Sequence, residues 1–238
     1  MKLEEHSVSS RDGAYTRKVW MRPGPVDRVH PLAIFLDAEY YLRDMDSPQM
    51  LEGLMESSAI PELTILFVSH VDVPARVENF TCNPRYASFI AEDLFGWARE
   101  QNASIQASNN LISGLSLSGL QGVFTALSYP QKFSYCLAQS GSFWWEDCRL
   151  IGEIANYAAS GQRYWLSVGD EEVATHIDRP QIGLYQEVSQ IEGVTRTADA
   201  LRTIGAEVSY HLFKGGHAPA PWSDDLPKGM QWLFGSNN

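Results

Sequence analysis

The feature that most constrains the fold is a series of short, almost wholly apolar segments separated by stretches with helical periodicity. Segments this rich in Leu, Ile, Val and Phe leave no face for water, which is typical of strands buried on both sides of a parallel sheet. The predicted strands span residues 31–37, 63–70, 110–115, 135–139, 164–169 and 208–214.

The stretches between these strands have the period expected of helices that connect parallel strands. The clearest predicted helices span residues 86–101, 117–128, 182–204 and 221–234. The alternation predicts an α/β fold of the α/β-hydrolase type, with a mostly parallel central sheet and helices on both faces. Residues 1–30 predict an antiparallel edge strand ahead of the parallel core, and the length of 238 residues predicts one domain over 1–238.

Charge and terminal composition narrow the classes of partner. The chain has 29 acidic and 18 basic residues, a formal charge of −11, and no Lys/Arg stripe, which argues against nucleic acid and anionic membranes. Its start, MKLEEHSVSS, has acidic residues where a signal peptide has a basic start followed by an apolar run, so we expect a cytoplasmic protein. The three cysteines, Cys82, Cys136 and Cys148, do not have the spacing of metal ligands, and no metal or cofactor is predicted. Nothing in the sequence indicates the oligomeric state.

A candidate nucleophile lies where a predicted strand meets a predicted helix. Residues 114–119 read Gly-Leu-Ser-Leu-Ser-Gly, close to the G-x-S-x-G turn whose small residues let strand and helix approach. Ser116 has the small residues Gly114 and Ser118 on either side, whereas Ser113 and Ser118 each have a leucine at a flanking position. The pattern therefore predicts Ser116 as the nucleophile, with Ser118 in place of the second glycine.

A serine hydroxyl needs a neighbouring base, and the chain order of this fold places that histidine last. His217 follows Lys-Gly-Gly directly after the last predicted strand and precedes the final helix. His176 is its only serious rival, and it reads more simply as a solvated loop residue. His217 is therefore the predicted general base.

The acid that orients the base should follow the strand between the serine and the histidine. Residues 167–172, Ser-Val-Gly-Asp-Glu-Glu, end such a strand with three carboxylates. Asp170 lies nearest the strand and Glu172 farther into the loop, and the pattern alone leaves Asp170, Glu171 and Glu172 open.

An oxyanion hole in this fold combines two backbone amides. The first is predicted at Leu117, directly after the nucleophile. The second should come from the loop after the first core strand, at Ala38 or Glu39.

Several segments together resemble the putative esterase (esterase D-like) family of α/β hydrolases, and within it the catalytic domain of enterochelin esterases. The resemblance spans about residues 30–235 and rests on residues 31–40 (PLAIFLDAEY), 114–119, 139–145 (QSGSFWW) and 215–217 with Trp222. It implies Ser116 as nucleophile and His217 as base, and its acid position falls on Glu172. Ala38 stands where the family usually has glycine. Enterochelin esterases carry a further N-terminal domain, so a different or smaller ester is expected.

Aromatic residues follow the strand that ends at residue 139. Phe143, Trp144 and Trp145 could form a wall for an acyl or aryl group, or simply pack in the core. The loop after the second core strand adds polar candidates that also fit a solvated loop. They are Arg76, Glu78 and Asn83.

These assignments predict a serine carboxylic-ester hydrolase that works through an acyl-enzyme, on siderophore-like or other aryl or acyl esters. Two alternatives remain: an acyltransferase on the same fold, and a catalytically silent hydrolase fold that binds a siderophore or a protein. The expected partner is a small-molecule ester.

Overall fold

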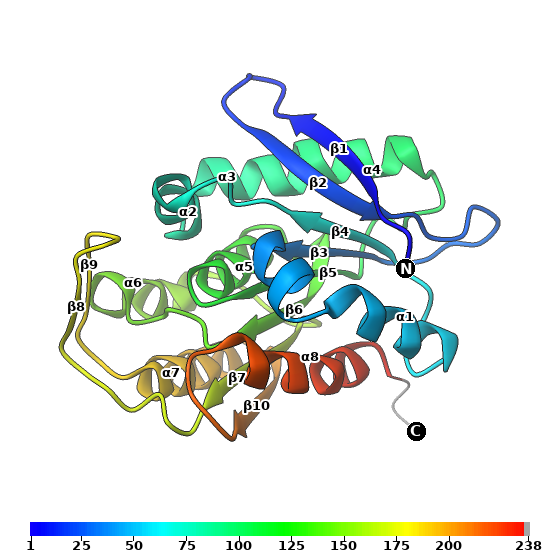
Figure 1. Ribbon diagram of the computed structural model, residues 1–238. Coiled ribbons are helices and arrows are strands. Elements are labelled where there is room, and N and C mark those ends of the chain that lie inside the picture. The colour runs from blue at the N-terminus through cyan, green and yellow to red at the C-terminus, as the bar shows by residue number, and fades with distance from the viewer. Residues whose placement is uncertain (236–238) are drawn as a thin grey trace.

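A sheet of eight strands runs through the centre of the protein in the order β1-β2-β4-β3-β5-β6-β7-β10 (Figure 1). The computed structural model describes residues 1–235. The strands are β1 (Glu4–Ser9), β2 (Thr16–Arg22), β3 (Leu32–Leu36), β4 (Thr64–Val68), β5 (Asn110–Leu115), β6 (Phe133–Gln139), β7 (Arg163–Gly169) and β10 (Glu207–Phe213).

The parallel core consists of the strands that the apolar segments predicted. β4, β3, β5, β6, β7 and β10 pair in parallel, neighbour to neighbour. Each begins and ends close to the predicted bounds, because a fully buried strand is marked by the apolar run itself. The α/β-hydrolase fold is confirmed.

The N-terminal region differs in detail from the single edge strand that the sequence suggested. It forms a hairpin, in which β1 pairs with β2 and β2 pairs antiparallel with β4. The strand β1 at the edge is mostly exposed, so its sequence carries little apolar signal.

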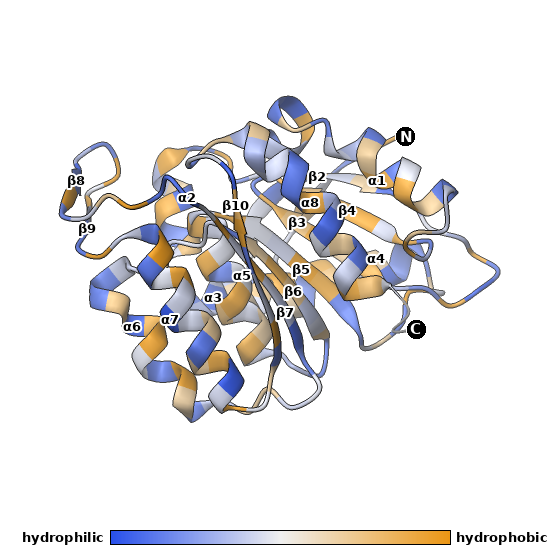
Figure 2. Cartoon of the chain, turned by 90° about the horizontal axis from the view of Figure 1, so that it is seen from below, coloured by the Kyte–Doolittle hydropathy of each residue, from blue (hydrophilic) through white to orange (hydrophobic). Residues whose placement is uncertain are grey.

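Helices cover both faces of this sheet. Alternate side chains of β3 enter separate cores, Ile34 and Leu36 on one face and Ala33 and Phe35 on the other. Figure 2 shows mostly hydrophobic strands, and helices that carry both kinds of residue. One face is covered by α1 (Ser47–Glu56) and α8 (Pro219–Phe234), the other by α2 (Val73–Phe80), α3 (Pro84–Ser88), α4 (Phe95–Gln101), α5 (Leu117–Ser128), α6 (Trp145–Glu153) and α7 (Gln190–Thr203).

Some of the predicted helices match the structure and others do not. Residues 117–128 form α5 as predicted, and α8 begins two residues early, whereas residues 86–101 are divided among α3, the π-helical turn η2 (Phe89–Leu94) and α4. Within residues 1–235, no helix is both long and apolar enough to cross a bilayer.

The prediction of one helix over 182–204 was wrong at its start. The chain first forms a two-stranded hairpin of β8 (Ile177–Arg179) and β9 (Leu184–Gln186), which turns at Gly183 with a φ of +65°. The helix α7 begins only after Ser189, whose hydroxyl accepts a hydrogen bond from the amide of Glu192 at 3.1 Å. This cap fixes the boundary that periodicity alone did not show.

A buried carboxylate anchors α8 to the sheet. Asp225 accepts hydrogen bonds from Ser167 Oγ at 2.6 Å and from Gln139 Nε2 at 2.9 Å, and His211 Nδ1 lies 2.5 Å from its other oxygen. These contacts tie α8 to β6, β7 and β10, and so fix the end of the loop that carries His217.

Candidate active site

The predicted site residues gather at one edge of the sheet, where the parallel strands end. Ala38 and Glu39 follow β3, Ser116 follows β5, Glu172 follows β7 and His217 follows β10. The chain passes from β3 to β4 on one side and later places β5 on the other side of β3. Such a switch point opens a crevice in parallel sheets, which explains why these loops meet there.

The turn at Ser116 is held in a strained conformation. Ser116 has a φ of +55° and a ψ of −122°, a region that non-glycine residues rarely adopt. A Cβ at Gly114 would lie 2.3 Å from the carbonyl oxygen of Ser118, and one at Gly119 would lie 3.2 Å from Gly141 Cα. The tight approaches thus fall on Gly114 and Gly119, which leaves room for a side chain at position 118.

Ser118 uses that room to join the turn to the loop after β3. Its Oγ accepts a hydrogen bond from the amide of Leu115 at 2.9 Å and lies 2.7 Å from Asp37 Oδ2. The serine is fully buried. Where the G-x-S-x-G pattern has a glycine, Ser118 thus adds a contact between the turn at Ser116 and the loop after β3. These are the two segments that carry the predicted oxyanion amides.

Ser116, His217 and Glu172 form one chain of hydrogen bonds. Ser116 Oγ lies 3.0 Å from His217 Nε2, and His217 Nδ1 lies 2.7 Å from Glu172 Oε2. Because the ionised carboxylate can only accept, Nδ1 carries the proton and Nε2 is free to accept from the serine. This is the arrangement in which an imidazole can remove a hydroxyl proton.

Asp170 and His176, two of the other candidates for acid and base, lie elsewhere. Asp170 accepts hydrogen bonds from Lys214 Nζ at 2.6 Å and from the Gly215 amide at 3.0 Å, and does not contact His217. His176 Nδ1 lies 3.0 Å from the Tyr185 hydroxyl on the β8–β9 hairpin. The geometry brings neither to Ser116.

Glu172 is held by groups that the sequence did not assign. Its Oε1 accepts from Ser140 Oγ at 2.5 Å and from the Gly169 amide at 2.8 Å. Trp222 Nε1 donates to Ser140 Oγ at 2.9 Å, and the Trp222 ring packs edge-on against His217 with centroids 4.9 Å apart. Trp222 thereby supports both the carboxylate and the imidazole.

The predicted oxyanion amides belong to the two segments that Ser118 joins, the start of α5 and the loop after β3. Leu117 is the first residue of α5, so its N–H has no acceptor within the helix. Ala38 is buried in the turn after β3, which Tyr40 closes by donating its amide to the Asp37 carbonyl at 3.0 Å. The Glu39 carboxylate is turned toward Ser69 Oγ at 2.5 Å.

An ion cluster around the buried Asp37 carboxylate fixes the loop after β3. Arg76 donates to Asp37 through Nε at 2.8 Å and Nη2 at 2.6 Å, and His70 Nδ1 lies 2.9 Å from both Asp37 Oδ1 and Glu39 Oε2. Burial would raise the pKa of Asp37, but Arg76 and His70 hold that pKa below its ordinary value. Arg76 is therefore already neutralised. The sequence offered no sign of His70 here beyond its place at a strand end.

The same cluster predicts a pH-dependent stability. Burial opposes protonation of His70, but its two carboxylate neighbours outweigh burial and raise its pKa from 6.5 to about 9. Its contribution to stability is therefore complete below pH 6.5 and is lost as the pH rises through about 9. Urea unfolding at pH 6 and pH 9.5 should show a loss on the order of 1–3 kcal/mol that His70→Asn lacks. The control His176→Asn should behave like the wild type, and parallel curves for all three proteins would contradict the prediction.

Two small cavities flank the imidazole. One of about 120 Å³ is lined by Arg76, Ser116, Leu117, Ser142, Trp144, Arg179, Ile182, Gln190 and His217. The other, of about 180 Å³, is lined by Glu171, Glu172, Ala174, Ile177, Arg179, Gln186, Gln190 and His217.

The predicted aromatic wall is reduced to one residue. Trp144 lines the cavity beside Ser116, and its Nε1 donates to Gln190 Oε1 at 2.7 Å. Phe143 and Trp145 are buried in the core and line neither cavity. Of the polar loop candidates only Arg76 reaches a cavity, since Asn83 caps α3 instead. Among residues 1–235, no group of His, Cys, Asp and Glu could hold a metal ion.

Comparison with known proteins agrees with the predicted resemblance. The iron(III) enterobactin esterase of Dickeya dadantii is 24% identical, matching 92% of this chain and 52% of the relative. The structure of the enterobactin esterase from Shigella flexneri superimposes with a TM-score of 0.84 at 23% identity, covering 98% of this chain and 59% of that one. A ferulic acid esterase superimposes with a TM-score of 0.78 at 12% identity, covering 98% and 97%.

The chain spans about half the length of the enterobactin esterases that it matches. The family described as putative esterase matches residues 16–233, nearly the whole chain. On that match, the chain belongs to the putative esterase family of α/β hydrolases.

Proposed function

We propose that the protein is a serine carboxylic-ester hydrolase in which Ser116 is the nucleophile, His217 the general base and Glu172 the acid that orients it. The observation that carries the proposal is the continuous hydrogen-bonded chain from Ser116 Oγ to the Glu172 carboxylate, at 3.0 and 2.7 Å. Membership of an esterase family supports it. In the proposed reaction an acyl-enzyme forms and is then hydrolysed.

In the first step, Ser116 Oγ attacks the ester carbonyl while His217 Nε2 takes its proton. The amide of Leu117 and that of Ala38 or Glu39 would hold the oxyanion, and Glu172 stabilises the imidazolium. Collapse of the intermediate breaks the ester bond, and the departing alkoxide takes the proton from His217. Water then gives a proton to His217 and attacks the acyl group. The bond from the acyl carbon to Ser116 Oγ breaks, Oγ takes the proton back from His217, and the acid is released.

The substrate class is proposed as aryl or short acyl esters. The cavity beside Ser116 is small, at about 120 Å³, and Trp144 supplies it with one flat wall. Relatives named as enterobactin esterases and a structural neighbour named as a ferulic acid esterase support an aromatic group on the ester. Siderophore-like esters are one member of this class.

Covalent labelling tests the mechanism directly. A fluorophosphonate should label the wild type at a single serine, identified as Ser116 by peptide mass spectrometry, because it is the only serine of the described part of the chain whose hydroxyl contacts a histidine. Ser118→Ala should label like the wild type, since Ser118 bonds to Asp37 instead. Ser116→Ala should not label.

Absence of an adduct on the folded wild type would contradict the proposal and favour a binding protein that keeps the hydrolase fold. An adduct at another serine would overturn the assignment of Ser116. Addition of a simple alcohol to a p-nitrophenyl butyrate assay separates hydrolysis from acyl transfer, because a transferase would form mainly the new ester.

A further inference from the structure

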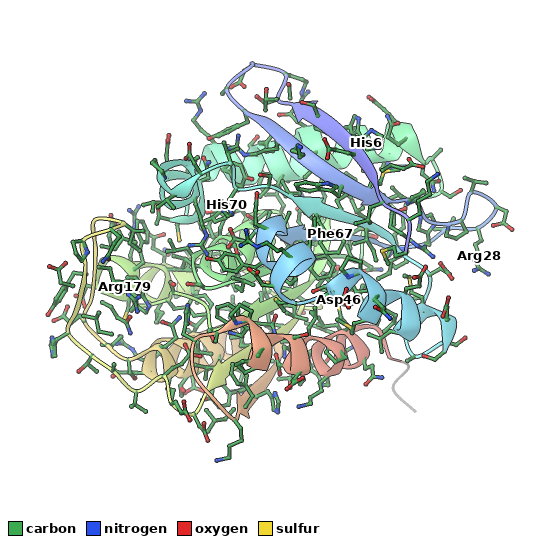
Figure 3. The ribbon with its side chains drawn as sticks, viewed as in Figure 1. His6, Arg28, Asp46, Phe67, His70 and Arg179 are labelled. Atoms are coloured by element: carbon green, nitrogen blue, oxygen red, sulfur yellow. The ribbon has the colours of Figure 1, made fainter. Side chains whose placement is uncertain are left out.

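The β8–β9 hairpin brings a second arginine to the site. Arg179 lies on this hairpin, which extends beyond α6 and α7 (Figures 1 and 3). Its side chain lines both cavities that flank His217. A substrate bound against Ser116 would therefore meet this guanidinium.

The two arginines at the cavity differ in their partners. The charge of Arg76 is matched by Asp37, at 2.6 Å, with the carboxylate fully buried. Arg179 has no carboxylate at ion-pair distance within residues 1–235; its nearest acceptor is the Gln186 side-chain oxygen, at 2.5 Å from Nη2 and 3.2 Å from Nε. Of the two arginines, Arg179 is thus the one without an ion-pair partner among the described residues.

Gln186 orients the guanidinium without neutralising it. The Gln186 amide oxygen accepts one N–H from Nε and one from Nη2, so both N–H groups of Nη1 and the second N–H of Nη2 remain for a ligand. Gln186 is itself buried and is fixed by donating to the Ala174 carbonyl at 3.3 Å. A guanidinium held in this way is prepared to bind a carboxylate through two parallel hydrogen bonds.

The surroundings of Arg179 strengthen the attraction of its guanidinium for an anion. The Arg179 guanidinium carbon lies 5.5 Å from the centre of the Trp144 ring, which forms an apolar wall beside it. Burial lowers the pKa of Arg179, although the Glu172 charge acts in the opposite direction. A partly desolvated cation next to an aromatic wall favours an anion as its partner.

We propose that Arg179 recognises a carboxylate on the substrate, so that the preferred esters carry an anionic group within reach of the reacting carbonyl. The inference rests on the proposed function and deepens it by naming a substrate class. Through Arg179, the β8–β9 hairpin would determine which esters the enzyme prefers. The anion could lie on the acyl side or on the alcohol side of the ester.

Two matched pairs of esters separate these cases. Mono-p-nitrophenyl adipate and p-nitrophenyl hexanoate differ by an acyl-side carboxylate, and 4-butyryloxybenzoate and phenyl butyrate differ by an alcohol-side carboxylate. Arg179→Gln should lower kcat/KM by roughly 10- to 100-fold for the anionic ester of one pair, the pair whose carboxylate lies on the side that Arg179 reaches. It should lower kcat/KM for the neutral esters by less than about twofold. Arg179→Lys should restore part of the loss, because it keeps the charge without the fork.

Arg28→Gln is the matched control, since it removes the same charge at the opposite end of the molecule (Figure 3). It should leave the ratio of anionic to neutral turnover unchanged. A ratio that does not respond to Arg179→Gln in either pair, or an equal fall for all four esters, would overturn the inference while the esterase proposal stands. If the wild type cleaves none of the four esters and Ser116 takes no fluorophosphonate, both proposals fall together.

Discussion

Replacing Ser116 by alanine is expected to lower kcat for p-nitrophenyl butyrate by roughly 10⁴- to 10⁶-fold. The alanine removes the only hydroxyl that contacts His217 Nε2 among residues 1–235, at 3.0 Å, so no acyl-enzyme can form. The fold should survive, because Ser116 is held at its turn by its backbone, with its amide donating to the Gln139 carbonyl at 2.9 Å. Steady-state kinetics with active-site titration would measure the loss.

His217→Ala should cost about as much, and the double variant little more than either single one, because nucleophile and base act as a unit. Ser142→Ala is the control. Its hydroxyl lies 3.3 Å from Ser116 Oγ without contacting the base, so its loss should cost less than about tenfold. Near wild-type turnover by Ser116→Ala would remove the basis of the proposed mechanism.

The sheet was predictable from the sequence because its signal is local. Each core strand is an apolar run, so strands such as β3 and β4 can be recognised from their own residues without knowing which strands they pair with. The strand order then follows from the fold class. The helix cap at Ser189 and the β8–β9 hairpin depend on polar contacts that periodicity does not register, and residues 182–189 were accordingly predicted as helix.

The candidate site was predictable to the extent that its residues follow strands. Ser116 and His217 were predicted in this way, and the family resemblance implied Glu172 as the acid. The supporting roles of Ser140, Trp222 and His70 were not predicted, since they depend on contacts across long sequence separations. The role of Ser118 was hidden for the same reason: its partner, Asp37, lies 81 residues away.

The choice between Glu172 and Asp170 leads to the second large prediction. In Glu172→Gln, the donors Ser140 Oγ and Gly169 N, which now hold Oε1 at 2.5 and 2.8 Å, will retain the amide oxygen. The amide NH₂ group is then turned toward His217 Nδ1, which must accept. That forces the proton onto Nε2, where it cannot receive the Ser116 proton.

We therefore expect Glu172→Gln to lower kcat by roughly 10²- to 10⁴-fold with little change in KM, because it alters the base and leaves the cavity beside Ser116 in place. Asp170→Asn is the matched control, with the same chemical change two residues earlier. Asp170 bonds to Lys214 and Gly215, so its variant should lose no more than about twofold. The opposite pattern, a large loss for Asp170→Asn and a small one for Glu172→Gln, would mean that the loop rearranges during turnover and that Asp170 orients His217.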